Sequence, residues 1–335
     1  MERLQILVTM PQGEVFDTFW NEELLAQLSG IGEVHLNQTG AQYTQDGLCQ
    51  AIKNIDICVT GWGCPVFTAT VLAHANKLRF IAHTGGSVRP LVTDEAYNMG
   101  IRVASGNAVF AESVAEGTVA YALAALRKIP LYAKGMANGE WKGGGENRGL
   151  LGRSVGIVGY GMIARHVVEM LSPFRCHVKV CSRHISAEEL ARHGMESASL
   201  EQIFKSCDIV SLHSGMTAEN YHIITESLMN TMKNGALLIN TARGAVIDEA
   251  ALCRVLAKRQ DITAVLDVYE EEPLPPQHVL RTLPNALLMP HMAGPTIDRR
   301  FAVTQSILQD IRHYLQGEKL SCEISYEYAQ KMTLN

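Results

Sequence analysis

A glycine-rich turn between an apolar run and a helical pattern is the feature that most constrains how this chain folds. The apolar run, 155–159, has the pattern of a buried strand, and the turn reads Gly159-Tyr160-Gly161-Met162-Ile163-Ala164. Gly159 permits a tight turn, Gly161 has no Cβ to keep a pyrophosphate from the backbone, and Ala164 lets helix and strand pack closely. A plain structural turn is the alternative for the motif alone, because glycine triplets are common. With a strand before it and a helix after it, the motif predicts a dinucleotide site formed by Gly159, Tyr160, Gly161, Met162 and Ile163.

The bulk properties exclude several classes of protein. With 335 residues the chain is long enough for two domains, and its net charge of −5 leaves no basic excess for a nucleic acid. The first residues read into a strand rather than a signal peptide, and no apolar stretch looks long enough to cross a bilayer. Eight cysteines lie without a C-x-x-C pair, so neither a metal site nor a disulfide framework is expected. A cytoplasmic globular protein without membrane or nucleic-acid partners is indicated.

Strand and helix patterns alternate along the chain, which is typical of an α/β fold with parallel sheets. From residue 155 the alternation is regular and predicts six strands, the number in a doubly wound dinucleotide-binding sheet. A nearly all-apolar helix over 111–128 must be buried on more than one side, between domains or at a subunit interface. We expect a connecting loop over 135–152 and an amphipathic helix over 297–315 that covers a sheet. The tail, 321–335, is either an edge strand or frayed.

The end of the second strand of this sheet bears on the choice of dinucleotide. NAD-binding folds usually carry an acid there, which holds the ribose 2′-hydroxyl. This chain has Ser182-Arg183-His184 instead. Arg183 can grip a 2′-phosphate with two hydrogen bonds, and Ser182 can donate another. NADP(H) is therefore the predicted cofactor, with NAD still possible, unless Arg183 is only a solvated loop residue.

Three further patches follow strands, at the edge where open α/β sheets bind ligands. They read N-T-A-R-G around Arg243, D-V-Y-E-E-E-P over 267–273, and P-H-M-A-G around His291. Singly, each has an ordinary explanation: an arginine paired with a surface acid, a solvated acidic run, one histidine among twelve. A turn after an earlier strand, Gly85-Gly86-Ser87, can present backbone N–H groups to a carboxylate, although a flexible connector is the simpler reading of that stretch alone.

Together and in this order, the motifs resemble the D-isomer-specific 2-hydroxyacid dehydrogenases over most of the chain. The resemblance also includes Val114-Ala115-Glu116, Trp141 and Ser211-Leu212-His213. It implies two Rossmann-like lobes with the active site in the cleft. A doubly wound cofactor domain, 106–295, would be inserted into a smaller flavodoxin-like substrate domain, 1–105 plus 296–335. The apolar helix at 111–128 suits a homodimer contact.

The resemblance also assigns roles. Arg243, Glu272 and His291 would be the catalytic set of an oxidoreductase that moves hydride between NADP(H) and a small 2-oxo or D-2-hydroxy acid. His291 would be the general acid/base, Glu272 its partner, and Arg243 the ligand of the substrate carboxylate or carbonyl. Glu272 is chosen because the family's acid directly precedes the proline. The remaining implied contacts are Gly85, Gly86 and Ser87 with the substrate, and His213, Thr241, Ala242, Asp267 and His291 with the cofactor.

The chain departs from the family pattern at two places. The loop Gly85-Gly86-Ser87-Val88 replaces a more usual Gly-Val-Gly, which leaves the substrate undetermined; glyoxylate and hydroxypyruvate are suggested by resemblance only. Gly215 stands where a proline is usual two residues after His213. A second class of function is a nucleotide-sensing interaction protein, since some proteins of this fold are corepressors. A methyltransferase would leave the arginine, glutamate and histidine patches unexplained, and would need an acid in place of Ser182.

Overall fold

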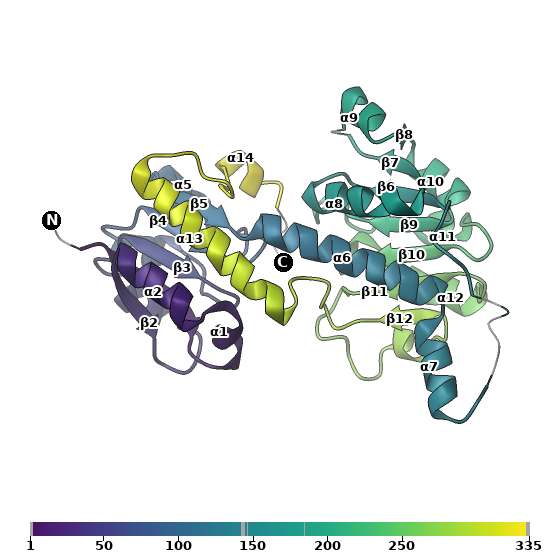
Figure 1. The fold of residues 1–335 in the computed structure, drawn as a ribbon, viewed down its shortest axis with the longest axis horizontal. Coiled ribbons are helices and arrows are strands. Elements are labelled where there is room, and N and C mark those ends of the chain that lie inside the picture. The colour runs from purple at the N-terminus through teal and green to yellow at the C-terminus, as the bar shows by residue number, and fades with distance from the viewer. Residues whose placement is uncertain (1–2, 142–144, 146, 184, 333–335) are drawn as a thin grey trace. The chain divides into compact units, whose positions relative to one another are not determined.

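The computed structural model describes residues 3–141, 145, 147–183 and 185–332. The chain folds into two compact units: unit 1 holds residues 1–111 with 295–335, and unit 2 holds 112–294. Both units are layered α/β folds, so the expected fold class is confirmed (Figure 1).

Unit 1 is built on a parallel sheet of five strands in the order β2-β1-β3-β4-β5. Its central strands are buried along their whole length, as expected when helices cover both faces of a sheet. The order is that of flavodoxin-like sheets. The strands are β1 (Gln5–Pro11), β2 (Glu33–Asn37), β3 (Ile57–Thr60), β4 (Phe80–His83) and β5 (Arg102–Ser105).

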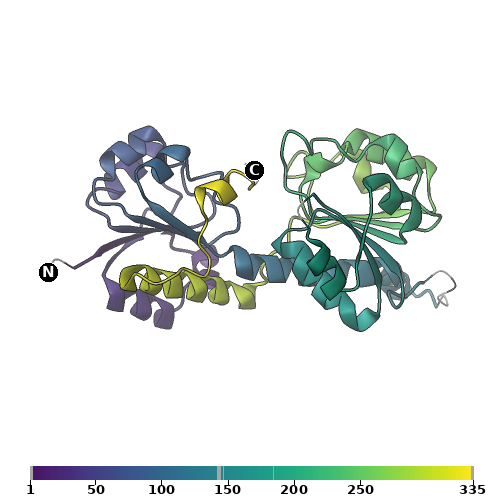
Figure 2. The same cartoon turned by 90° about the horizontal axis from the view of Figure 1, so that it is seen from above.

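Helices cover both faces of this sheet (Figure 2). On one face lie α1 (Glu14–Phe19), α2 (Glu22–Ile31) and α13 (Arg300–Gln316), and on the other α3 (Gln45–Ala51), α4 (Ala69–His74) and α5 (Asp94–Asn98). Val303, Ile307 and Ile311 of α13 are fully buried at four-residue spacing, which confirms the predicted amphipathic helix. A short 3₁₀ turn, η4 (Ile297–Arg299), precedes α13.

The C-terminal tail is neither a full edge strand nor frayed over its described residues. One antiparallel bridge joins Glu323 to Ala104 of β5, and the short helix α14 (Tyr326–Ala329) follows. Ile324 and Ala329 are buried in the core of unit 1. Residues 333–335 of the predicted tail lie outside the described residues.

Unit 2 contains a parallel sheet of seven strands in the order β12-β11-β10-β9-β6-β7-β8. The order reverses between β6 and β9, and such switch points are where open α/β sheets bind ligands. The predicted number of six strands is wrong by one, because β8 (Glu196–Ser197) is a two-residue edge strand too short to leave a periodic pattern. The others are β6 (Ser154–Val158), β7 (His177–Cys181), β9 (Ile209–Leu212), β10 (Leu237–Asn240), β11 (Thr263–Leu266) and β12 (Ala286–Leu288).

The helices of unit 2 form a layer on each side of the sheet. One hydrophobic cluster contains α6 (Asn107–Leu126) and α8 (Met162–Leu171), and a second contains α10 (Leu200–Ser206), α11 (Glu226–Asn230) and α12 (Glu249–Lys258). The shorter elements are α9 (Ala187–Arg192) and the 3₁₀ turns η1 (Ser172–Phe174), η2 (Gly244–Val246) and η3 (Val279–Thr282).

The long apolar helix, α6, starts earlier than expected and passes from unit 1 into unit 2 after Ala111. By length and composition it is apolar enough to cross a membrane, so the expectation that no stretch is long enough is wrong; core helices of soluble proteins pass the same test. A second helix, α7 (Ile129–Ala137), follows it and occupies the start of the loop expected over 135–152. Lys128 makes the left-handed turn between the two helices (φ 52°). Residues 142–144 and 146 of that loop lie outside the described residues.

Candidate active site

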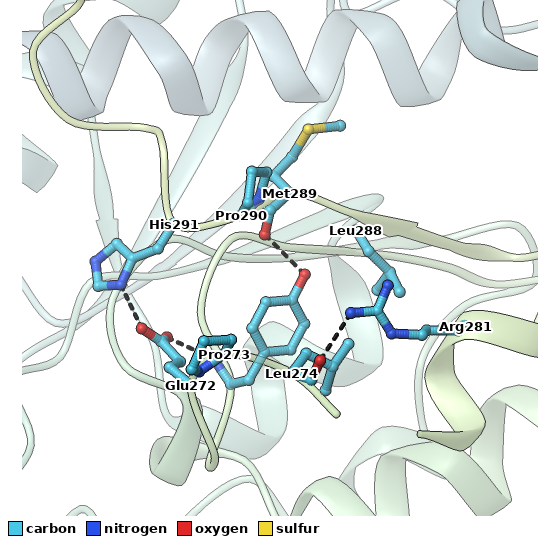
Figure 3. Close-up of a pocket in the computed structure, with 9 residues that line it drawn as sticks. Glu272, Pro273, Leu274, Arg281, Leu288, Met289, Pro290 and His291 are labelled. Atoms are coloured by element: carbon cyan, nitrogen blue, oxygen red, sulfur yellow. Dashed lines mark hydrogen bonds and ion pairs between the residues drawn. The ribbon is translucent and has the colours of Figure 1, made fainter. Parts of the chain in front are cut away.

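A histidine and a glutamate from two different patches meet in unit 2 (Figure 3). Nδ1 of His291 lies 2.6 Å from Oε2 of Glu272. The other carboxylate oxygen, Oε1, accepts a hydrogen bond from the backbone N–H of Tyr269 at 3.0 Å. The carboxylate is thus held at both oxygens and fixes one ring nitrogen of a half-exposed imidazole, which leaves Nε2 for proton transfer.

The turn that carries His291 is anchored by Asp267, which is almost fully buried at the end of β11. Its Oδ1 accepts from the backbone N–H of Met292 at 2.8 Å and its Oδ2 from that of Ala293 at 2.9 Å. The phenol of Tyr121 on α6 donates a third hydrogen bond, to Oδ1, at 3.1 Å. His291 itself has φ 52°, a conformation that is rare outside glycine and needs such support from its surroundings. Asp267 therefore positions the histidine, a role that sequence reasoning did not assign to it.

Helix α6 touches the loops that carry His291 and Arg243. A Cβ on Gly117 would lie only 3.0 Å from the carbonyl oxygen of Ala293, so the glycine lets the helix pack closely on the histidine turn. The next residue of the helix is Thr118, and its hydroxyl lies 3.0 Å from the hydroxyl of Thr241. The sequence offered no direct signal for these contacts, because they join residues more than a hundred positions apart.

The N-T-A-R-G loop holds Arg243 in a partly buried position. The side chain of Asn240 stabilises the loop with two hydrogen bonds: it donates to the carbonyl of Arg243 at 2.9 Å and accepts from the N–H of Ala242 at 3.1 Å. Burial lowers the pKa of the Arg243 guanidinium, and the negative charge of Glu272 opposes that shift. A Cβ on Gly244 would lie 1.9 Å from the carbonyl carbon of Tyr269, so this loop packs directly on the loop of Glu272.

The three glutamates of the acidic patch are not equivalent. Glu270 and Glu249 each accept a hydrogen bond from the other's backbone N–H, both at 3.2 Å. His222 lies 2.6 Å from Glu270 and His278 lies 3.2 Å from Glu249. Burial raises the pKa of Glu249. The structure thus uses Glu270 to close the loop, and Glu272 is the acid at the histidine.

The glycine-rich turn between β6 and α8 fits the pyrophosphate of a dinucleotide. Gly159 has φ 87°, and a Cβ there would lie 2.7 Å from the backbone nitrogen of Ser214. A Cβ on Gly161, at the start of α8, would meet nothing within 4 Å, so its backbone is open to a ligand. In the adjoining loop, burial lowers the pKa of His213 to about 4, and its buried Nδ1 has no partner among the described residues. The exposed backbone of Gly161, with a buried histidine nitrogen that has no described partner in the adjoining loop, suits a polar ligand.

An acidic side chain from another loop lies beside the end of β7. Nη1 of Arg183 lies 2.7 Å from Oε2 of Glu219, and both side chains are about seven-tenths exposed (72% and 69%). Glu219 belongs to the loop after β9, so inspection of the second strand alone misses it.

In unit 1, the Gly85-Gly86-Ser87 loop follows β4. The ring of His83 lies under it, and a Cβ on Gly85 would come 2.2 Å from Nε2 of that ring. His83 is buried with Nδ1 2.9 Å from the hydroxyl of Thr60, and burial lowers its pKa to about 4. Glycine at position 85 is therefore required by packing.

A cavity of about 550 Å³ opens beside the Glu272–His291 pair (Figure 3). Tyr269 lines it, and the Tyr269 hydroxyl lies within hydrogen-bond distance of two carbonyl oxygens, 2.8 Å from that of Met289 and 3.1 Å from that of Leu266. The remaining lining residues are Pro273, Leu274, Arg281, Leu288 and Pro290.

Comparison with known proteins identifies the family. Residues 119–293 match the NAD-binding domain of the D-isomer specific 2-hydroxyacid dehydrogenases. D-3-phosphoglycerate dehydrogenase of Methanocaldococcus jannaschii is 32% identical over 94% of this chain, which spans 58% of that relative. Glyoxylate reductase of Thermofilum pendens is 35% identical over 75% of this chain and 76% of its own. A phosphoglycerate oxidoreductase structure from Rhizobium etli covers 96% of this chain and 99% of its own, with 26% identity and a TM-score of 0.77.

Relatives named as reductases and dehydrogenases do not favour the alternative expectation of a nucleotide-binding interaction protein with little turnover. The chain belongs to the D-isomer-specific 2-hydroxyacid dehydrogenases and is an NAD(P)-dependent enzyme of that family.

Proposed function

We propose that the enzyme reduces a small 2-oxo acid to the D-2-hydroxy acid, and that it prefers NADPH to NADH. The observation that carries the proposal is the His291–Glu272 contact of 2.6 Å. It holds an imidazole by Nδ1 and leaves Nε2 as an acid for an oxygen that gains negative charge.

The nicotinamide supplies the hydride that reduces C2, and the side chains of unit 2 manage the charge and the proton. His291 gives a proton from Nε2 to the carbonyl oxygen, while Glu272 stabilises the imidazolium. Arg243 binds the substrate carboxylate and orients the carbonyl. Gly85, Gly86 and Ser87 are the proposed backbone contribution of unit 1 to carboxylate binding. In the oxidative direction neutral His291 accepts the hydroxyl proton.

A replacement of the histidine tests this role. His291→Ala should lower kcat by about 10²–10⁴, the usual contribution of a general acid, while the Kd for NADPH stays within about threefold. His177→Ala, at an exposed position on β7, is the control. Unchanged turnover in His291→Ala would refute the assignment. The assay is NADPH oxidation followed spectroscopically with a panel of 2-oxo acids.

The cofactor is proposed to bind along the carboxyl edge of the sheet of unit 2. Tyr160, Gly161, Met162 and Ile163 would surround the pyrophosphate, and His213, Thr241, Ala242 and Asp267 would line the nicotinamide half. Ser182 and Arg183 would hold the 2′-phosphate of NADP(H) once Arg183 leaves Glu219. Arg183→Ala should lower kcat/KM for NADPH and leave that for NADH nearly unchanged. A higher kcat/KM for NADH in the unaltered enzyme would contradict the preference.

A homodimer belongs to the same proposal. Helix α7 and the segments beside it expose large apolar side chains that a monomer would leave in water. These are Ile129 (53%), Leu131 (59%), Met136 (52%), Trp141 (90%) and Leu151 (61%). Leu131→Glu should shift the mass measured by light scattering from dimer to monomer, and Val279→Glu, at an exposed site on η3, should not. A monomeric unaltered protein would refute the dimer.

The substrate is proposed to be a small 2-oxo acid, of which glyoxylate and hydroxypyruvate are the first to assay, because relatives are named glyoxylate reductase. We place the enzyme in the cytoplasm, where its cofactor is abundant and its eight cysteines stay free thiols. Cell fractionation tests the location.

A further inference from the structure

Three aromatic rings and one arginine gather at the carboxyl edge of the sheet in unit 1. We call Phe19, Trp62, Phe110 and Arg300 the Trp62–Arg300 cluster. Trp62 follows β3, Phe19 ends α1, Phe110 lies in the first turn of α6, and Arg300 begins α13. The ring of Trp62 meets those of Phe19 and Phe110 edge to face, with centroids 5.2 and 6.1 Å apart. The first part of the chain therefore builds an aromatic surface where open α/β sheets bind ligands.

The guanidinium of Arg300 lies against this surface, and no described carboxylate pairs with it. Its Cζ is 5.1 Å from the ring centroid of Trp62 and 5.5 Å from that of Phe19. Nη1 donates to the hydroxyl of Thr18 at 3.0 Å, while Nε is buried and has no hydrogen-bond partner in the part of the chain that the structure describes. Among residues 3–141, 145, 147–183 and 185–332, no carboxylate lies within ion-pair distance of it. The aromatic rings compensate only part of the charge.

The position of Arg300 in its helix further disfavours its positive charge. It is the first residue of α13, where the helix dipole disfavours a positive charge. A partly buried cation at the wrong end of a helix, with an unsatisfied donor, is stabilised when an anion binds beside it.

The cluster is continuous with the loop proposed to bind the substrate carboxylate. A Cβ on Gly86 would lie 3.7 Å from Cδ1 of Phe110, whose ring meets that of Trp62. Trp62 keeps 40% of its surface exposed, so its ring is accessible to a ligand. Glyoxylate, which ends at its aldehyde carbon, has no group to reach this surface.

We propose that the Trp62–Arg300 cluster binds a second anionic group at the distal end of the substrate. The preferred substrate is then a 2-oxo acid with a further carboxylate or phosphate, whose carbon chain lies on Trp62 and whose anion meets Arg300. This inference rests on the proposed function, since it names the substrate class of the same reaction.

Matched substrates test it with the complete enzyme. 2-Oxoglutarate and 2-oxovalerate differ only in the distal carboxylate, and phosphohydroxypyruvate and hydroxypyruvate only in the phosphate. In at least one pair the charged member should have a kcat/KM about tenfold higher or more, as one charge-assisted hydrogen bond provides. The pair that shows the difference identifies the anion as carboxylate or phosphate.

Variants separate charge from packing. Arg300→Gln should bring the ratio of kcat/KM between the charged and the uncharged substrate close to one, mainly through KM. The kcat/KM for the uncharged substrate should change by less than about threefold. Arg300→Lys keeps the charge and should retain part of the ratio, which a merely structural arginine would not require. Turnover of 2-oxo acids with no preference for the charged member, or a preference that survives Arg300→Gln, overturns the inference and leaves the proposed function standing. Absence of turnover of every 2-oxo acid with either cofactor overturns the proposed function itself, and this inference with it.

Discussion

Replacement of Asp267 by asparagine tests whether the histidine turn is held by a buried carboxylate. Asp267 accepts two backbone N–H groups, from Met292 and Ala293, through different oxygens. An asparagine keeps one acceptor and turns an NH₂ group toward the other N–H. We therefore expect one charge-assisted hydrogen bond to be lost, about 1.5–3 kcal/mol of folding free energy. Displacement of His291 by about 1 Å would lower kcat about 100-fold.

The assay separates positioning from cofactor contact. If Asp267 acts through the histidine turn, kcat of Asp267→Asn falls while the Kd for NADPH is nearly unchanged. If the carboxylate instead contacts the nicotinamide half, the Kd rises as well. The readouts are steady-state kinetics per folded enzyme, NADPH binding by fluorescence, and urea unfolding.

Tyr121→Phe is the matched control, because it removes only the phenol hydrogen bond to the same carboxylate. It should cost about 1 kcal/mol and change kcat less than about threefold. A kcat of Asp267→Asn within about threefold of the unaltered enzyme would refute the reasoning, and so would equal damage from Tyr121→Phe.

Gly244→Ala should lower Tm by several degrees and abolish activity, because its Cβ would lie 1.9 Å from the carbonyl carbon of Tyr269. Gly161→Ala has open space around its Cβ, so it should keep Tm and weaken NADPH binding. Equal Tm values for the two variants would contradict this. Glu272→Gln keeps a hydrogen bond to the imidazole but not the charge, so kcat should fall about 10-fold or more, and unchanged kcat would exclude imidazolium stabilisation. The free energy of unfolding should fall as pH drops from 6.5 to 4, by up to about 3 kcal/mol from His83 alone, because the unfolded chain takes up a proton that the buried ring refuses until its pKa of about 4. Urea unfolding across that range measures it, and a His83→Gln variant should show a flatter dependence; identical slopes would count against the assignment.

Much of the fold could be predicted from local patterns. The buried four-residue strand Ile57–Thr60 is uniformly apolar or β-branched, and Leu237–Asn240 is apolar up to its last residue. The two-residue strand β8 could not be predicted, because it forms only against β7. Helix α7 was missed since Gly135 in its last turn reads as loop composition.

The candidate site, like the fold, could be predicted only in part from the sequence. Order and spacing of motifs were enough to predict the family and the enzyme class, which the comparisons confirm. The individual roles of Arg243, Glu272 and His291 stay predictions. Contacts made across long sequence distances, such as Glu219 with Arg183 and Arg300 with Trp62, could not be predicted, because Glu219, Arg300 and Trp62 stand in no motif.

The contacts of α6 have a consequence for the interpretation of natural variants. Gly117, Thr118 and Tyr121 lie close together on a helix that contains none of Arg243, Glu272 and His291, yet they touch Ala293, Thr241 and Asp267. A saturation mutagenesis screen would therefore find a narrow stripe of loss-of-activity substitutions there. An allele altered in this stripe should be classed with active-site lesions, even when the encoded protein is abundant and folded.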